Sequence, residues 1–365
     1  MPLNTQAAYT QQLDAKIATL HELLAGLDTP EPEVFGSAHR HYRQRAEFRF
    51  WHAGADGFYA MFDPATPREP VRVDSFPAAS QRINALMVSL RGAVLASPEL
   101  KSGLFQVEFL DTLAGETLLT LIYHRRLDVA WEAAAGVLAR CLDVRIVGRS
   151  RKQRITVGED FVTERLQLDG REFVLRQPEG CFTQPNAEVN RSMLAWARAA
   201  CVQNDGGLVE LYCGIGNFTV AVAEHFENVL ATEINKVAIA AATHNLAANG
   251  IDNTFIARLS SEETAAALAR TRPFRRLQGF DLDDFAARTV LVDPPRAGLD
   301  PRTLALVAGF DRIIYISCNP HTLQQNLWAL AGTHRIERFA AFDQFPYTPH
   351  LECGVSLGRR TAPVQ

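Results

Sequence analysis

Apolar and polar positions follow two different rhythms along the chain. Over residues 5–27 and Pro77–Leu95, apolar residues recur at helical spacing and predict two helices. Elsewhere in the first half, polar and apolar residues alternate, which is typical of half-buried strands. The alternating stretches predict two hairpins, formed by residues 45–51 with 58–62 and 104–110 with 118–124. We therefore expect residues 1–175 to form an N-terminal helix and an α+β domain with an antiparallel sheet.

From about residue 176, short apolar runs alternate with helical patterns. The runs are residues 208–212, 229–233, 254–259, 289–293, 312–317, 338–342 and 352–358. Such alternation is typical of a doubly wound parallel sheet with helices on both faces. Seven such strands resemble the Rossmann-like sheet of class I methyltransferases, in which the last strand is inserted near the end. We expect residues 176–365 to form this α/β domain.

Composition allows a soluble protein with a large core, since 47% of the 365 residues are hydrophobic and 21% are charged. No window holds the ~18 uncharged apolar residues that a membrane span needs. Asp14, Lys16 and Glu22 interrupt the first apolar stretch, which therefore does not resemble a signal peptide. The six cysteines form no C-x-x-C pair, so neither a metal site nor an iron–sulfur cluster is expected. We expect a cytoplasmic protein with reduced thiols, no membrane contact and no obligate protein partner.

The net charge of −4 does not indicate nucleic-acid binding, so an RNA site would have to be a local basic patch. Basic residues cluster at 39–49 and at 145–154. Strands in which arginines and aromatic residues alternate suit stacking on exposed bases. A sheet with one face in the core and one face exposed to solvent gives the same pattern. The candidate RNA-binding residues are Arg43, Arg45, Arg49 and Phe105.

A glycine loop, Glu210–Phe218, follows an apolar run and opens a helical pattern. Its glycines allow the backbone to approach a ligand closely at a strand–helix turn. Glu233, at the end of the next run, can hold the hydroxyl groups of a ribose. The loop lacks the third glycine of dinucleotide-binding loops, which favours S-adenosylmethionine over NAD.

Two further motifs end predicted strands. Asp293-Pro294-Pro295-Arg296 places a carboxylate where open α/β sheets bind ligands, but it is also found in methyltransferases of exocyclic amines. Cys318 and Glu352 favour a methyltransferase that acts on a ring carbon over one that acts on an exocyclic amine. Carbon 5 of uracil becomes nucleophilic when a thiolate adds to carbon 6, and a base must later remove the carbon 5 proton. Cys318 supplies a candidate thiolate and Glu352 a candidate base.

These residues carry a family resemblance. The motifs F-T-Q-P-N at 182–186, E-L-Y-C-G-I-G-N-F, V-D-P-P-R-A-G-L-D, Y-I-S-C-N-P and D-Q-F-P-Y-T-P-H-L-E-C-G-V together resemble the RNA uracil-5 methyltransferases. In the first half, H-Y-R-Q-R-A-E-F-R-F-W-H, V-R-V-D-S-F-P-A-A-S and L-F-Q-V-E-F-L are similar too. Many ribosomal-RNA members carry an OB-fold and four clustered cysteines, which this chain lacks. The resemblance is therefore to the tRNA branch.

The resemblance implies a substrate, a cofactor and site residues. It implies methylation of the T-loop uridine of tRNA, uridine 54, to ribothymidine with S-adenosyl-L-methionine, and of the equivalent uridine of tmRNA. Cys318 would be the nucleophile and Glu352 the proton acceptor. The cofactor would contact Gln184, Tyr212, Asn217, Glu233 and Asp293.

Three other functions stay open at this point. The chain could methylate ribosomal RNA, or it could bind and open the T arm to assist tRNA folding, with incidental catalysis. An amine methyltransferase using Asp-Pro-Pro would leave Cys318 and Glu352 without a role.

Overall fold

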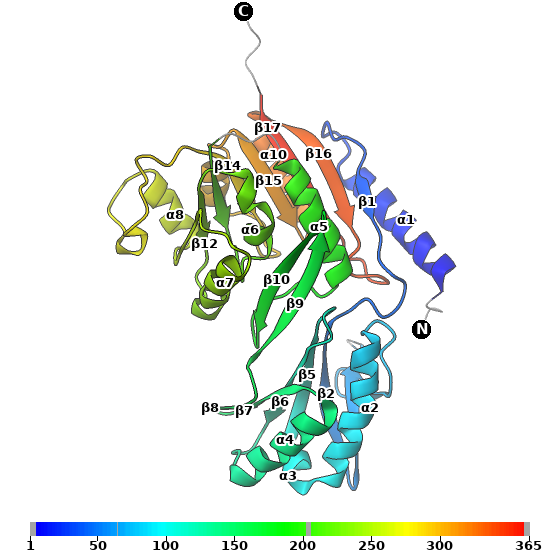
Figure 1. The fold of residues 1–365 in the computed structure, drawn as a ribbon. Helices are drawn as coiled ribbons and strands as arrows, with labels where there is room; N and C mark the ends of the chain where they lie inside the picture. Colours follow the sequence, from blue (N-terminus) through cyan, green and yellow to red (C-terminus); the bar gives the residue numbers. More distant parts are fainter. Residues whose placement is uncertain (1–4, 64, 202–205, 361–365) are drawn as a thin grey trace, which may run out of the picture.

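The computed structural model describes residues 5–63, 65–201 and 206–360, which form a large and a small lobe (Figure 1). The large lobe is built on an eight-stranded sheet with helices on both faces, and the small lobe on a seven-stranded sheet. The α-helices are α1 (Gln6–Leu23), α2 (Gln81–Ala96), α3 (Pro98–Lys101), α4 (Val129–Leu142), α5 (Ala187–Ala200), α6 (Asn217–Val222), α7 (Lys236–Ala248), α8 (Ser261–Leu268), α9 (Pro301–Val307) and α10 (Pro320–Leu330). No helix in the described ranges combines the length and apolarity needed to cross a membrane.

The large sheet confirms the predicted doubly wound arrangement. Its strands are β1 (Glu33–Phe35), β11 (Gly207–Leu211), β12 (Val229–Thr232), β13 (Thr254–Ala257), β14 (Ala287–Val292), β15 (Arg312–Ser317), β16 (His334–Phe342) and β17 (Glu352–Arg359). They run in the order β1-β16-β17-β15-β14-β11-β12-β13. Only β17 is antiparallel to its neighbours, since it enters the sheet between β15 and β16. Seven of these strands are the predicted ones.

The eighth strand, β1, was not predicted. It pairs in parallel with β16, with Glu33 opposite Ala340 and Phe35 opposite Phe342. Three residues are too few to show an alternating pattern, so only the partner strand reveals this element. Helix α1 also packs on the large lobe, where Leu20 and Leu24 share a core with Leu323 of α10. A domain boundary near residue 175 stays a proposal, although α1 and β1 both belong to the large lobe.

The small lobe confirms both predicted hairpins. Its strands are β2 (Arg45–Ala53), β3 (Asp56–Phe62), β4 (Pro70–Val73), β5 (Leu104–Asp111), β6 (Thr117–Tyr123), β7 (Arg145–Ser150) and β8 (Gln153–Val157). All neighbours pair antiparallel except β6 and β7, which are joined through α4. Helices α2 and α4 cover one face of this sheet, where Phe48, Phe109 and Trp131 are buried.

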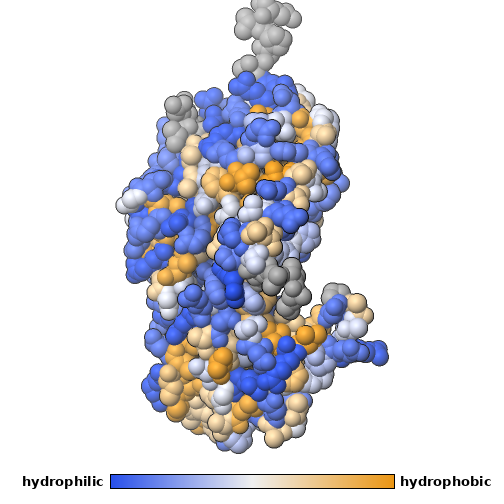
Figure 2. Space-filling model, turned by 90° about the vertical axis from the view of Figure 1, so that its right-hand side faces the viewer, coloured by the Kyte–Doolittle hydropathy of each residue, from blue (hydrophilic) through white to orange (hydrophobic). Residues whose placement is uncertain are grey.

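The other face of the small sheet is open and carries Glu47, Arg49 and Trp51 at alternating positions of β2. A two-stranded hairpin, β9 (Phe161–Leu168) and β10 (Arg171–Pro178), leads from the small lobe into the large one (Figure 1). Figure 2 shows the side that carries α1 and α2, where hydrophilic residues cover most of the large lobe and apolar residues are more frequent on the small lobe.

Candidate active site

The carboxyl ends of three parallel strands bring three of the predicted cofactor residues to one edge of the large sheet. Leu211 of β11 lies opposite Val292 of β14 and opposite Thr232 of β12. The residues that follow, Tyr212, Asp293 and Glu233, therefore leave the sheet side by side. This edge is where open α/β sheets bind ligands.

Cys318 and Glu352 meet at the same edge although β15 and β17 run in opposite directions. Val292 of β14 lies opposite Tyr315 of β15, and Ser317 at the end of β15 lies opposite Cys353. Cys318 therefore leaves β15 beside Glu352, where β17 begins. Cys353 itself is fully buried in the core beneath the sheet.

The glycine loop has a defined backbone conformation and is tied to Glu233 by a hydrogen bond. Tyr212 adopts the left-handed conformation with φ of 63°, and Gly216 with φ of 81° caps α6. One carboxylate oxygen of Glu233 accepts a hydrogen bond from the Gly214 amide at 3.1 Å. The other accepts from the backbone amides of the two following residues at 2.7 and 2.8 Å. Glu233 is thereby held beneath the loop with a defined orientation.

Asn217, the first residue of α6, is held by a residue that the sequence analysis did not single out. Its side-chain amide exchanges two hydrogen bonds of 2.9 Å with the amide of Asn190 on α5. No local pattern could reveal this pair, because the two residues are far apart in sequence and meet only through the packing of α5 on α6.

Gln184 precedes α5 and has an unfilled acceptor. Its Oε1 atom is buried and has no hydrogen-bond partner among the described residues. An unpaired buried acceptor is costly, so a ligand with a donor group at this place would relieve the cost. The residues present at this edge thus fit an adenosyl cofactor, with Glu233 suited to the ribose.

Two carboxyl groups, Glu352 and Asp293, lie near the candidate nucleophile Cys318. Burial and, to a smaller extent, the neighbouring Asp293 raise the pKa of Glu352 to about 8, against the opposing effect of Arg296. Burial likewise raises the pKa of Asp293 to about 7. Burial raises the pKa of the Cys318 thiol to about 11, with Glu352 and Asp293 acting in the same direction and Arg296 opposing them. The edge thus favours a bound cation, which would stabilise the ionised forms of all three groups.

Cys318 opens onto a cavity of about 680 Å³. One wall is α1, which contributes Gln12, Lys16 and Leu20, and the opposite wall is residues 348–351, just before Glu352. Arg296 and the start of α10 complete the lining. A flat ring can therefore reach the thiol between the first helix and the last loop of the chain.

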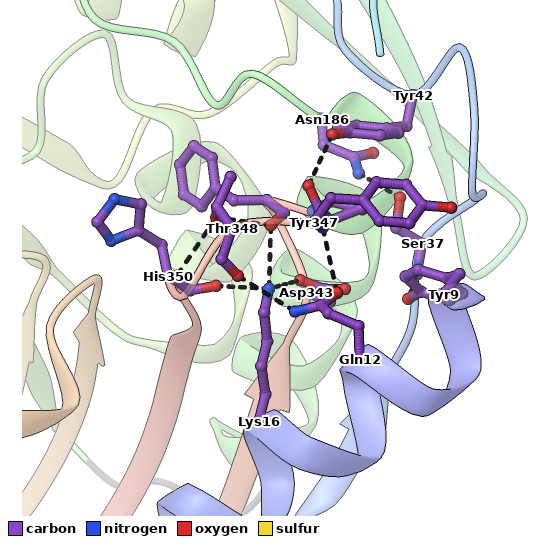
Figure 3. A network of polar contacts seen from close by, with 12 residues as sticks. Tyr9, Gln12, Lys16, Ser37, Tyr42, Asn186, Asp343, Tyr347, Thr348 and His350 are labelled. Atoms are coloured by element: carbon purple, nitrogen blue, oxygen red, sulfur yellow. Dashed lines mark hydrogen bonds and ion pairs between the residues drawn. The ribbon is translucent and has the colours of Figure 1, made fainter. Parts of the chain in front are cut away.

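The loop between β16 and β17 is held by α1 through a buried ammonium group (Figure 3). Nζ of Lys16 lies 2.6 Å from Oδ1 of Asp343 and donates to the carbonyl oxygens of Phe345 and His350 at 2.9 and 2.8 Å. Gln12 adds two hydrogen bonds of 3.1 Å to the same loop. The sequence offered one signal for this network, since Lys16 stands on the buried side of α1 with Tyr9 and Leu20.

The four candidate RNA-binding residues do not form one cluster. Arg49 and Phe105 lie together on the open face of the small sheet, with the guanidinium carbon 3.4 Å from the ring centroid. Phe105 also stacks on His124 at 3.8 Å between ring centroids, a contact that sequence reasoning missed. Arg45 donates to the carbonyl oxygen of Cys181 at 3.1 Å, toward the large lobe. Arg43 precedes β2, is partly buried, and donates to the Arg45 carbonyl oxygen at 2.7 Å.

Within the described residues, no group of three or more histidine, cysteine or acidic side chains could hold a metal ion, and Cys141, Cys181, Cys213, Cys318 and Cys353 form no disulfide bond.

Comparison with known proteins identifies what the chain is similar to. The family model described as tRNA (uracil-5-)-methyltransferase matches residues 8–360. A tRNA/tmRNA (uracil-C(5))-methyltransferase of Pseudomonas entomophila is 55% identical over 352 residues, covering 96% of this chain and 98% of the relative. One of the same name from Aromatoleum aromaticum is 54% identical over 363 residues, covering 100% and 99%. The fold matches the crystal structure of Pyrococcus abyssi tRNA (uracil-54, C5)-methyltransferase in complex with S-adenosyl-L-homocysteine, with a TM-score of 0.70, 21% identity and coverage of 96% of this chain and 83% of that one.

Proposed function

The chain belongs to the tRNA (uracil-5-)-methyltransferase family, and from that premise we propose that it methylates carbon 5 of a tRNA uridine through a covalent bond to Cys318. The proposed methyl donor is S-adenosyl-L-methionine, which the S-adenosyl-L-homocysteine bound to the Pyrococcus abyssi enzyme supports. The observation that carries the proposed mechanism is the placement of Cys318 beside Glu352, at the sheet edge that also bears the glycine loop.

The cofactor, when bound, supplies an electrophilic methyl group on a positively charged sulfonium. Glu233 would hold the ribose hydroxyl groups, and Gln184 would donate or accept through its amide. Tyr212, Asn217 and Asp293 would complete the contacts. The unpartnered Oε1 of Gln184 and the fixed carboxylate of Glu233 support this assignment.

Cys318 and Glu352 divide the chemistry between them. The Cys318 thiolate forms a bond to carbon 6 of the uracil ring, which makes carbon 5 nucleophilic. Carbon 5 would then accept the methyl group supplied by the bound cofactor, and the electron pair of the methyl–sulfur bond would stay on the sulfur. Glu352 removes the carbon 5 proton, and the bond between carbon 6 and the Cys318 sulfur breaks, which regenerates the thiolate.

The raised pKa values of this edge define what binding must achieve. A thiol whose pKa lies at about 11 is rarely ionised at neutral pH, and a carboxyl whose pKa lies at about 8 is mostly protonated. Arg296 lowers both values, and the sulfonium adds a second positive charge. We infer that cofactor binding prepares Cys318 and Glu352 for reaction.

The proposed substrate is uridine 54 in the T arm of tRNA, with the equivalent uridine of tmRNA as a second substrate. The names of the relatives support tRNA and tmRNA, and the name of the Pyrococcus abyssi structure supports position 54. A T-loop uridine must leave its stack to reach Cys318, at a cost of a few kcal/mol. The proposed location of the protein is the cytoplasm.

Incubation with an unmodified tRNA transcript and S-adenosylmethionine tests the proposal. The RNA is digested and the methylated nucleoside is identified by mass spectrometry. We expect 5-methyluridine in the T loop, its loss in Cys318→Ala, and full activity in the matched control Cys141→Ala, which removes an exposed cysteine of the small lobe. A methylated amine that survives Cys318→Ala would refute the mechanism, and methylation of ribosomal RNA alone would refute the substrate.

A further inference from the structure

The basic stretch at residues 145–154 forms one wall of a groove on the small lobe. The groove has a volume of about 790 Å³ and lies between the end of β6, residues 122–126, and the tip of the β7–β8 hairpin, residues 149–153. Its lining contains five cationic side chains and no carboxylate. The cations are Arg125, Arg126, Arg149, Arg151 and Lys152.

Three of these cations are not neutralised by the protein. Arg126, Arg151 and Lys152 are exposed and form no ion pair within the described part of the chain. Arg149, by contrast, pairs with the buried Glu179 at 2.6 Å. Arg125 reaches Asp128 at 4.0 Å. The groove therefore keeps about three uncompensated positive charges on a chain whose net charge is −4.

The two walls are joined by hydrogen bonds, so the cations are held on a preformed frame. The side-chain amide of Gln153 donates to the carbonyl oxygen of Leu127 at 2.7 Å and accepts from its amide at 2.9 Å. The hydroxyl group of Ser150 donates to the carbonyl oxygen of Arg125. Lys152 sits in the turn between β7 and β8 and has a φ of 59°.

The groove is continuous with the aromatic stack on the open face. His124 lines the groove and stacks at 3.8 Å on Phe105, which in turn carries the guanidinium of Arg49 at 3.4 Å. A surface that offers flat side chains beside free cations suits a nucleic acid, in which bases and phosphates alternate along the strand.

We propose that this groove binds the sugar–phosphate backbone of the tRNA arm next to the methylated loop, through Arg126, Arg151 and Lys152. The proposal rests on the proposed function, since it assigns a second contact surface to the same substrate. Contacts to phosphates position the RNA without reading its sequence. The groove would therefore contribute affinity and leave the chemistry at Cys318 unchanged.

The test compares the full chain with a variant that carries Arg126→Ala, Arg151→Ala and Lys152→Ala. The equilibrium constant for binding of an unmodified tRNA transcript is measured between low and high salt, and methylation is measured at steady state. Each lost phosphate contact reduces the salt slope by about 0.7–0.9, so we expect a decrease of about 2–3. We also expect at least a tenfold increase in KM for tRNA with kcat unchanged.

A matched control carries Arg140→Ala, Arg258→Ala and Arg275→Ala, three exposed arginines outside the groove. The same loss of affinity in the control would overturn the proposal, because it would reflect net charge alone. A wild-type salt slope and KM in the groove variant would overturn it as well, as would a loss of kcat at constant KM. Absence of tRNA methylation by the unmodified chain would instead contradict the proposed function, and the binding comparison would still decide on the groove.

Discussion

At the scale of single residues, the separate roles of Cys318 as nucleophile and Glu352 as proton acceptor predict that a covalent protein–RNA adduct can be trapped. Glu352→Gln keeps the size of the side chain but cannot accept a proton, so the adduct can form but cannot collapse. We expect turnover to fall by at least a hundredfold while a protein–RNA complex survives denaturing electrophoresis. The double variant with Cys318→Ala should show no such complex. Its appearance there would mean that another residue forms the bond.

Glu210, buried in β11, predicts how stability depends on pH. Burial raises the pKa of this carboxyl from 4.5 to about 8, and its Oε2 atom has no hydrogen-bond partner among the described residues. Between these values the folded state keeps a proton that the unfolded state has lost, so stability falls as pH rises from about 4.5 to 8. Glu210→Gln should remove this loss.

We expect urea unfolding to show the Glu210→Gln protein more stable than the parent at pH 8, by roughly 1–3 kcal/mol, with the difference narrowing toward pH 5. An equal difference at both pH values would contradict the assignment to ionisation of Glu210. Glu262→Gln, an exposed carboxyl, serves as the control.

Local sequence predicted the residues of the sheet edge because parallel strands end together. Tyr212, Glu233, Asp293 and Cys318 each follow an apolar run, and the fold then brings them side by side. Asn190 could not be found in this way, since it acts only through Asn217 of a separate helix. The roles of these residues in binding and chemistry stay predictions.

At the scale of elements, the buried ammonium group of Lys16 joins α1 to the loop before Glu352, beside the two hydrogen bonds of Gln12. Replacing Lys16 by Met leaves the fully buried Asp343 without its cation, and loss of one partner of a buried pair costs about 3–5 kcal/mol. We expect Lys16→Met to lower the free energy of unfolding by about this amount and to reduce methylation. Chemical denaturation and steady-state kinetics measure the two effects.

The double change Lys16→Met with Asp343→Asn separates the two consequences. Removing both charges should recover much of the stability, while methylation stays low because the loop has lost its anchor. Full recovery of activity would show that the network serves stability alone. Gln11→Ala on the exposed side of α1 should change neither quantity.

The small lobe depends on a glycine where β7 crosses α4. A Cβ atom at Gly148 would lie 2.1 Å from the ring of Trp131, which is fully buried. Gly148→Ala should therefore destabilise the protein by about 1–3 kcal/mol through overpacking. Gly92→Ala, inside α2 with open space around it, should be neutral or stabilising by up to about 1 kcal/mol. Thermal unfolding compares the pair, and equal effects would contradict this reading of the packing.

Elements with a clear period were predicted well, whereas β1 was not. Both hairpins and seven strands of the large sheet have their own pattern of apolar and polar residues, so the sequence alone locates them. β1 has three residues and is defined by its partner β16. Its contacts cross some three hundred residues of sequence, a distance over which periodicity carries no information.

At the scale of the whole molecule, short polar contacts fasten the lobes near the active site. The backbone amide of Gln44, just before β2, donates to the carbonyl oxygen of Pro185 at 2.7 Å. The side-chain Oε1 of Gln44 accepts from the backbone amide of Ala187 at 3.0 Å. Tyr42 donates to the carbonyl oxygen of Pro346 at 3.1 Å. The segment before β2 is thereby joined to the residues next to Gln184 and to the loop before Glu352, which fixes the small sheet relative to the candidate active site.

This arrangement predicts that binding and chemistry can be lost separately. Arg49→Ala and Phe105→Ala remove the stack on the small lobe, and a stacked base is worth about 1–3 kcal/mol. We expect each to weaken tRNA affinity by about five- to a hundredfold with kcat changed less than threefold. Cys318→Ala should show the opposite, with no turnover and near-normal affinity.

Because the stack and the thiol share no partner, the affinity of the Phe105→Ala, Cys318→Ala double variant should equal that of Phe105→Ala alone. Unchanged affinity in both single variants of the stack would remove the open face from the RNA-binding surface, and loss of kcat in either would place it in the reaction itself.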